Sequence, residues 1–84
     1  MDFRIMRKPD KQLRKLIGEK IRSARKERGM TQYEVVERID IDVSHYQRIE
    51  RGETNPSLII AYRICRALRI SLDDLFRTSH ESLQ

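Results

Sequence analysis

Polar side chains within residues 43–51 are spaced so that they would share one face of a helix. At about 100° per residue, four of them fall within roughly a 100° arc, and Tyr46 and Ile49 fall on the opposite side. The four are Ser44, Gln47, Arg48 and Arg51. Hydroxyl, amide and guanidinium groups in such a row can hydrogen-bond the polar edges of another molecule. Taken alone, the row more often indicates a solvated helix face, so both interpretations stand at this point.

Residue types used for catalysis and metal binding are scarce and scattered. Cys65 is the single cysteine, so it forms no internal disulfide, and no zinc-ligand spacing joins it to His45 or His80. The sequence has no nucleophile–histidine arrangement, no carboxylate pair suited to a cleft and no phosphate-cradling glycine loop. We therefore predict a protein that is not an enzyme, with no cofactor, no metal site and no evident small-molecule ligand.

The chain is short, basic and unevenly charged. Its 84 residues fit a single domain, 37% of them are charged and the net charge is +5. The pI near 9.8 favours a polyanionic partner. Residues 1–28 carry eleven Lys and Arg against four Asp and Glu, whereas residues 29–56 carry three against six. Bulk charge alone would thus point to the wrong segment, because the polar row lies in the acidic middle third.

No apolar run approaches the ~20 residues of a membrane span, and no secretory signal follows Met1. Together with the lone cysteine, this predicts a cytoplasmic protein with no membrane partner.

Apolar periodicity and capping residues place the first helices. One apolar stripe predicts a helix over about 11–28, ended by a left-handed Gly29. The stripe is Leu13, Leu16, Ile17, Ile21 and Ala24. Thr31 and Glu34 form a capping box for a second helix that ends near Ile39.

Residues 40–42 are long enough only for a tight turn, and Asp42 suits the N-cap of a third helix over 43–51. Ser57 suits the cap of a fourth helix, and Ser71 with Asp74 forms the capping box of a fifth that ends near residue 76 or 77. The core stripe expected for the fourth is Leu58, Ala61, Ile64, Cys65 and Leu68. No segment alternates like a strand, so we predict an all-α, compact five-helix domain over 10–77. Residues 1–9 are expected to be a flexible basic arm, and 78–84 a frayed tail.

Several short strings, and the distances between them along the chain, resemble those of the lambda-repressor/Cro-like helix-turn-helix family of DNA-binding proteins. They are residues 17–25 (IGEKIRSAR), 30–32 (MTQ), 48–53 (RIERGE), 55–57 (NPS) and 73–76 (DDLF). The similarity covers about residues 13–76. The NPS string also resembles the short controller proteins of restriction–modification systems. The sequence departs from the family at Val36, where a small residue is usual, and at Asp40, where glycine is frequent; Asp tolerates the left-handed conformation.

The resemblance implies that the polar row lies in the major groove of double-stranded DNA. Base-reading roles are then expected for Val43, Ser44, Gln47 and Arg48. Phosphate-binding roles are expected for Gln32, Arg51, Thr54 and Asn55. The family's buried salt bridge corresponds to Arg25 and Glu50, with a structural role.

Apolar residues beyond the core stripe suggest a partner surface. We expect a homodimer interface formed by Ile59, Ile60, Tyr62, Leu72 and Phe76. The leading hypothesis is a transcriptional regulator that reads a (pseudo)palindromic operator. An antitoxin or a protein-interaction module of the same fold is the alternative. The arm at 1–9 could enter a minor groove or act only by general attraction.

Overall fold

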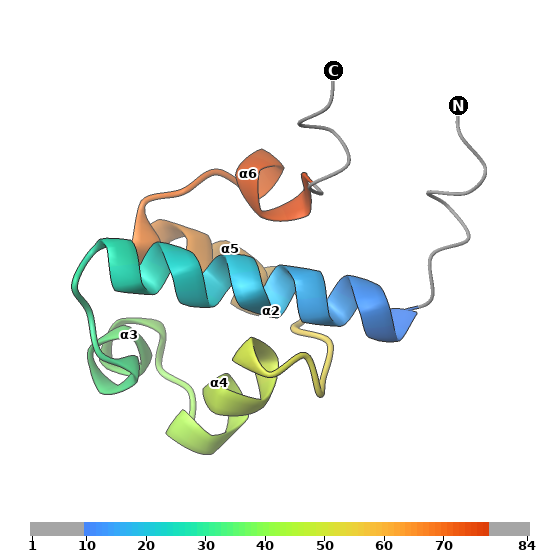
Figure 1. Cartoon of the computed structure of the whole chain (residues 1–84). Helices are drawn as coiled ribbons and strands as arrows, with labels where there is room; N and C mark the ends of the chain where they lie inside the picture. The colour runs from blue at the N-terminus through green and yellow to red at the C-terminus, as the bar shows by residue number, and fades with distance from the viewer. Residues whose placement is uncertain (1–9, 78–84) are drawn as a thin grey trace.

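The computed structural model describes residues 10–77, and over that range its regular structure is entirely α-helical. The helices are α2 (Asp10–Glu27), α3 (Gln32–Ile39), α4 (Val43–Glu50), α5 (Leu58–Leu68) and α6 (Leu72–Phe76) (Figure 1). The predicted all-α class is confirmed, and each predicted helix is present with ends within about one residue. The expected basic arm at 1–9 and the tail at 78–84 lie outside the described residues.

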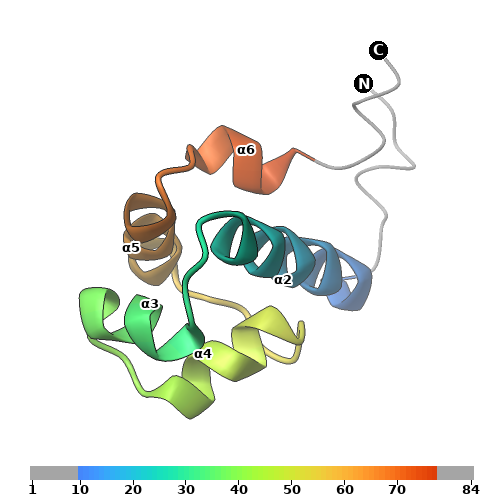
Figure 2. The same ribbon diagram turned by 60° about the vertical axis from the view of Figure 1, so that its left-hand side comes forward.

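Helix α2 crosses the middle of the molecule, with α3 and α4 on one side of it and α6 on the other (Figure 1). It packs against α4, α5 and α6, and α3 packs against α4 and α5. Turning the molecule shows α5 beside α3, closing the side of the bundle opposite to the start of α2 (Figure 2). Helix α4 therefore has one side on α2 and α3 and the other facing solvent.

One core of large apolar side chains joins the five helices. Its fully buried members are Ile21, Val35, Ile39, Tyr46, Ile49, Ile64, Leu68 and Leu75. The prediction for Leu58 is wrong, because its side chain is 69% exposed. The buried face of α5 is turned toward Ile60 and Ala67, so Leu58 lies at its edge in the first helical turn. Ile60 and Leu72, expected to be surplus to the core, are instead partly buried against it.

Turns and caps fix where the helices begin and end. Both predicted capping boxes are present, at Thr31 and at Ser71. Gly29 has the expected left-handed backbone, at φ 66°, and Asp40 ends α3 in the same region, at φ 59°. Asp42 occupies the N-cap of α4 as predicted, although its carboxylate accepts no hydrogen bond from an amide of the first turn. Close to the start of α4, Tyr46 belongs to the core and Ile41 packs partly against the core.

A close approach between α2 and α4 depends on Gly18. A Cβ at this position would lie 2.4 Å from the carbonyl oxygen of Glu50 and 2.6 Å from that of Ile49, both backbone atoms. Glycine is required here because any side chain would push the end of α4 away from α2. The contact determines how closely α4 packs against α2. The apolar stripe predicted for residues 11–28 did not reveal it.

Candidate nucleic-acid interface

Helices α3 and α4 form a helix-turn-helix whose second helix presents a polar face. The turn spans 40–42 and is tight because Asp40 adopts the left-handed conformation and its N–H bonds the carbonyl of Val36. Tyr46 and Ile49 are buried and anchor α4, as their angular position predicted. On the opposite side, Ser44, Arg48 and Arg51 are exposed and Val43 and Gln47 are half-buried.

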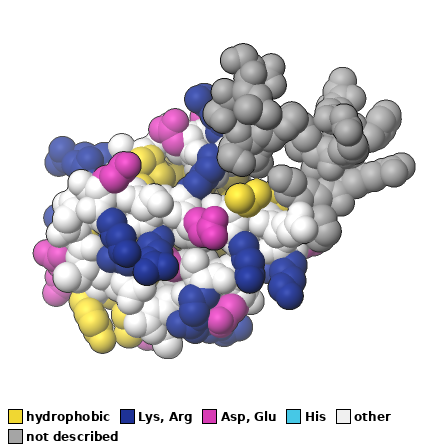
Figure 3. All heavy atoms as spheres, viewed as in Figure 1, with side chains coloured by type: hydrophobic (Ala, Val, Ile, Leu, Met, Phe, Trp, Pro, Cys, Tyr) yellow, Lys and Arg dark blue, Asp and Glu magenta, His cyan; other side chains and the backbone are white. Residues whose placement is uncertain are grey.

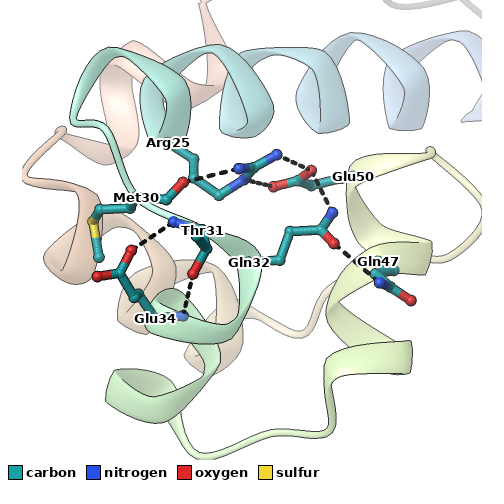
Figure 4. Close-up of polar contacts among 7 residues, drawn as sticks. All are labelled: Arg25, Met30, Thr31, Gln32, Glu34, Gln47 and Glu50. Carbon is teal, nitrogen blue, oxygen red and sulfur yellow. Dashed lines mark hydrogen bonds and ion pairs between the residues drawn. The ribbon is translucent and has the colours of Figure 1, made fainter.

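An ion pair between α2 and α4 lies directly behind this face. Arg25 donates from Nε to Glu50 Oε2 at 2.7 Å and from Nη2 to Oε1 at 3.2 Å. Its Nη1 donates to the carbonyl oxygen of Met30, 2.9 Å away, where the chain turns into α3. The side chains of Arg25 and Glu50 are 11% and 4% exposed, so water scarcely reaches the pair. This pair thus ties α2, the α3 entry and α4 together (Figure 4).

Hydrogen bonds continue from the ion pair to the outward face of α4. Gln32 Nε2 donates to Glu50 Oε1 at 3.0 Å, and Gln47 Nε2 donates to Gln32 Oε1 at 3.0 Å (Figure 4). Burial would raise the pKa of Glu50, but hydrogen bonds from Arg25 and Gln32 hold that pKa below its usual value. Burial raises the pKa of the neighbouring Tyr46 hydroxyl, whose oxygen has no hydrogen-bond partner among residues 10–77.

The residues expected at phosphates lie at the two ends of the helix-turn-helix. Gln32 is at the start of α3, and Thr54 and Asn55 are in the loop after α4. Arg51 donates from Nε to Glu53 at 2.7 Å, in a pair whose side chains are about half exposed. Exposed pairs of this kind contribute little, so a phosphate can replace Glu53 as the partner of Arg51. The carbonyl of Arg48 accepts a hydrogen bond from the N–H of Glu53, but its guanidinium forms no hydrogen bond or ion pair with residues 10–77 and lies only near enough for its charge to lower the pKa of Glu53.

Comparison with known proteins decides the family. The model of the helix-turn-helix family HTH_3 matches residues 21–75. The chain belongs to this family. An HTH-type transcriptional regulator of Methanothermobacter thermautotrophicus is 46% identical over 57 residues, which cover 67% of this chain and 83% of the relative. Control protein C.MunI of a Mycoplasma species is 37% identical over 60 residues, covering 70% and 81%.

A solved structure agrees with the sequence relatives. The restriction–modification controller protein C.AhdI from Aeromonas hydrophila matches with a TM-score of 0.72 at 28% identity, covering 75% of this chain and 96% of that one. The resemblance stated from the sequence is confirmed, including the similarity to controller proteins. The HTH_3 protein is a DNA-binding transcriptional regulator and not an enzyme.

A basic groove of the regulator runs between α2 and the helix-turn-helix. It is bordered by α2, the start of α3 and the end of α4, and Arg14 donates across it to the carbonyl of Gly52 at 3.3 Å. Dark blue side chains are spread over this face around a few acidic ones (Figure 3). The α2 cations that line the groove, apart from the paired Arg25, are Lys11, Arg14, Lys15 and Arg22. They were not among the site residues predicted from the sequence, although their spacing already placed them on one helix.

The regulator also has an apolar surface away from the groove. Ile59 and Tyr62 of α5 are 59% and 48% exposed, and Leu58 and Phe76 are exposed as well. Arg66 covers part of the Tyr62 ring, with its guanidinium carbon 5.8 Å from the ring centroid and Nη1 3.1 Å from the hydroxyl. Of the five residues expected at a dimer interface, Ile59, Tyr62 and Phe76 are therefore free of the core, while the other two pack partly against it.

Neither a metal site nor a membrane helix is found in the described part of the regulator. No three His, Cys, Asp or Glu side chains from residues 10–77 gather as metal ligands would. Cys65 is buried, and burial raises the pKa of its thiol. Within the same residues, none of the helices has the length and apolar character needed to span a bilayer.

Proposed function

We propose that the regulator acts as a homodimer on a (pseudo)palindromic operator, whose bases it reads in the major groove with the outward face of α4. The observation that carries this proposal is the state of that face. Helix α4 is anchored by Tyr46 and Ile49, and the exposed guanidinium of Arg48 makes no hydrogen bond or ion pair with residues 10–77, with only the charge of Glu53 nearby. The Arg48 guanidinium has its hydrogen-bond donors available, and it lies on the same face as the Gln47 amide, which Gln32 holds in place. Both groups are therefore suited to reading base edges rather than to stabilising the fold.

Each base-reading role follows from side-chain chemistry. Arg48 can donate two hydrogen bonds to guanine, and Gln47 can pair with adenine. Ser44 can serve several bases, and Val43 can contact the methyl group of thymine. Because Arg48 suits guanine whereas Gln47 suits adenine and Val43 suits thymine, the proposed half-site contains both G·C and A·T pairs.

Phosphate contacts would fix the register without reading sequence. The proposed set is Gln32, Arg51, Thr54 and Asn55 together with the α2 cations of the basic groove. Two features support this set: the amides at the start of α3 favour an anion, and the groove cations outnumber the acidic residues left unpaired there.

The exposed apolar surface of α5 and α6 supports the homodimer. Ile59, Tyr62 and Phe76 would be buried in both copies at once by a two-fold interface. Such pairing would place two α4 helices about one DNA turn apart, roughly 34 Å or ~10 base pairs between half-site centres.

Selection of binding sites from a random DNA pool tests this function directly. We expect an enriched sequence with two-fold symmetry and half-site centres ~10 base pairs apart. Enrichment of a single unsymmetrical half-site contradicts the homodimer. No enrichment at all contradicts sequence-specific reading and favours a protein-interaction module.

A further inference from the structure

The amide groups of Gln32 and Gln47 have a defined orientation because their hydrogen-bond chain starts at a carboxylate. Glu50 can only accept hydrogen bonds, so the part of Gln32 that faces it must be the NH2 group. The carbonyl oxygen of Gln32 then faces Gln47, and this oxygen also can only accept. The NH2 group of Gln47 must therefore point back to Gln32, as Figure 4 shows.

This orientation leaves Gln47 with a limited set of groups for DNA. Its amide has two N–H donors and one carbonyl acceptor, and Gln32 takes one donor. One N–H and the carbonyl oxygen remain. Adenine presents an acceptor (N7) beside a donor (N6) in the major groove, whereas guanine presents two acceptors (N7 and O6). A glutamine with both N–H groups free can donate twice to guanine; a glutamine with one N–H committed cannot.

We propose that Gln32 is a positioning residue that makes Gln47 select adenine over guanine. The inference rests on the proposed function, since it requires Gln47 to meet a base. It deepens that function by assigning the selectivity of one base pair to a residue on the preceding helix. The second N–H of Gln32 stays available for a phosphate, so both roles are compatible.

Competition binding with operator variants tests the proposal. Gln47→Met first identifies the base pair whose preference depends on Gln47. In Gln32→Met, which keeps side-chain length but has no amide, we expect the preference for adenine over guanine at that pair to fall about 5-fold or more, because a bidentate pair discriminates by roughly 5- to 150-fold. Preferences at other base pairs should stay unchanged. A uniform weakening at every pair would show that Gln32 acts only on phosphate or on the fold.

A double variant separates positioning from a general structural effect. With Gln47 already replaced by Met, adding Gln32→Met should leave the preference at that base pair as it is, because no amide remains to be oriented. A second drop in the preference, equal to that of the single variant, would overturn the proposal.

Nuclear magnetic resonance of the free protein tests the contact itself. We expect a nuclear Overhauser effect between the side-chain amides of Gln32 and Gln47 in the unaltered protein. Gln32→Met should shift the Gln47 amide resonance and leave that of the exposed Gln12 in place. Absence of the contact overturns the inference even if Gln47 reads a base. If the contact is present in the unaltered protein but Gln47→Met leaves all base preferences unchanged, the base-reading role of Gln47 in the proposed function is overturned instead. The measurement on the unaltered protein holds whether or not a variant folds.

Discussion

The buried carboxylate of Glu50 both ties α4 to α2 and orients Gln32. With only 4% of its side chain exposed, it cannot exchange Arg25 for water. We expect Glu50→Gln to lower the free energy of unfolding by about 3–5 kcal/mol, because the charge of Arg25 would stay buried without a counter-charge. Urea denaturation at neutral pH measures this loss. The matched control is Glu53→Gln, in the exposed pair with Arg51, which should change stability little.

Acid provides a second readout of the same carboxylate. The pKa of Glu50 lies below its usual 4.5 in the folded state, since its hydrogen bonds outweigh the effect of burial. A carboxylate whose pKa is lower in the folded than in the unfolded protein stabilises the fold. This stabilisation is complete at pH values above the pKa of the unfolded protein, and it is lost as the pH falls through the pKa of the folded protein. The unaltered protein should therefore lose more stability than Glu50→Gln as the pH falls below 4.5. Parallel losses would contradict the role of the pair.

At the reading face, Arg48 is expected to contribute sequence preference. Arg48→Ala should weaken binding to the selected operator by about 1–3 kcal/mol and remove the preference at one or two base pairs. Arg51→Ala should instead weaken operator and random DNA alike, because phosphate contacts carry no sequence information. Fluorescence anisotropy with both DNAs measures the difference. If Arg48→Ala weakened both equally, the base-reading face of α4 would be wrongly assigned.

At the scale of helices, local signals predicted nearly all of the boundaries. Thr31 and Ser71 cap their helices as expected because an N-cap needs only residues three positions away. The apolar stripe of α5 was predicted on the correct side of the helix, but its limits were not. Periodicity alone does not show which residues at the edge of a stripe are covered by a neighbouring helix, and Leu58, at that edge, is exposed. Contacts between distant residues were the least predictable. Gly18 against the end of α4, and Gln32 bonded to Glu50, have no local signature.

The end of α5 is another feature that local signals did not reveal. Arg69 ends the helix at φ 58°, in the left-handed region where glycine is usual. We expect Arg69→Gly to raise the free energy of unfolding by about 0.5–1 kcal/mol, because the strain of a side chain there exceeds the added flexibility of glycine. Arg63→Gly, the same change inside α5, should lower it by about 1 kcal/mol. Thermal denaturation compares the two variants, and a loss of stability in both would contradict the strain at Arg69.

At the scale of the whole molecule, charge favours DNA although the middle third is acidic. The cations of the basic groove come from α2, which packs across the helix-turn-helix and brings them beside it. If about 5 phosphates are neutralised per bound unit, the slope of log K against log [salt] should be roughly −4 to −5. Lys15→Gln should make the slope shallower by about 1, and Arg63→Gln, on α5 away from the groove, should leave it unchanged. A slope near zero would contradict phosphate binding by these cations.

The apolar surface is a separate feature of the whole molecule, because it lies on α5 and α6 rather than beside α4. Ile60 is unsuitable for testing it, since its side chain packs partly against the core and a charge there would unfold the domain. Ile59 and Tyr62 are more exposed and can be changed without opening the core.

We expect the double variant Ile59→Glu with Tyr62→Glu to be a folded monomer, because four carboxylates would face one another across a two-fold interface. Sedimentation equilibrium at tens of micromolar should give the dimer mass for the unaltered protein and the monomer mass for the variant. Tyr33→Glu, which places the same charge on an exposed tyrosine of α3, should remain a dimer. The monomer should also bind a palindromic operator weakly, since one α4 helix reads too few base pairs to hold a site alone. An unaltered protein that stays monomeric and still binds one half-site tightly would contradict the homodimer.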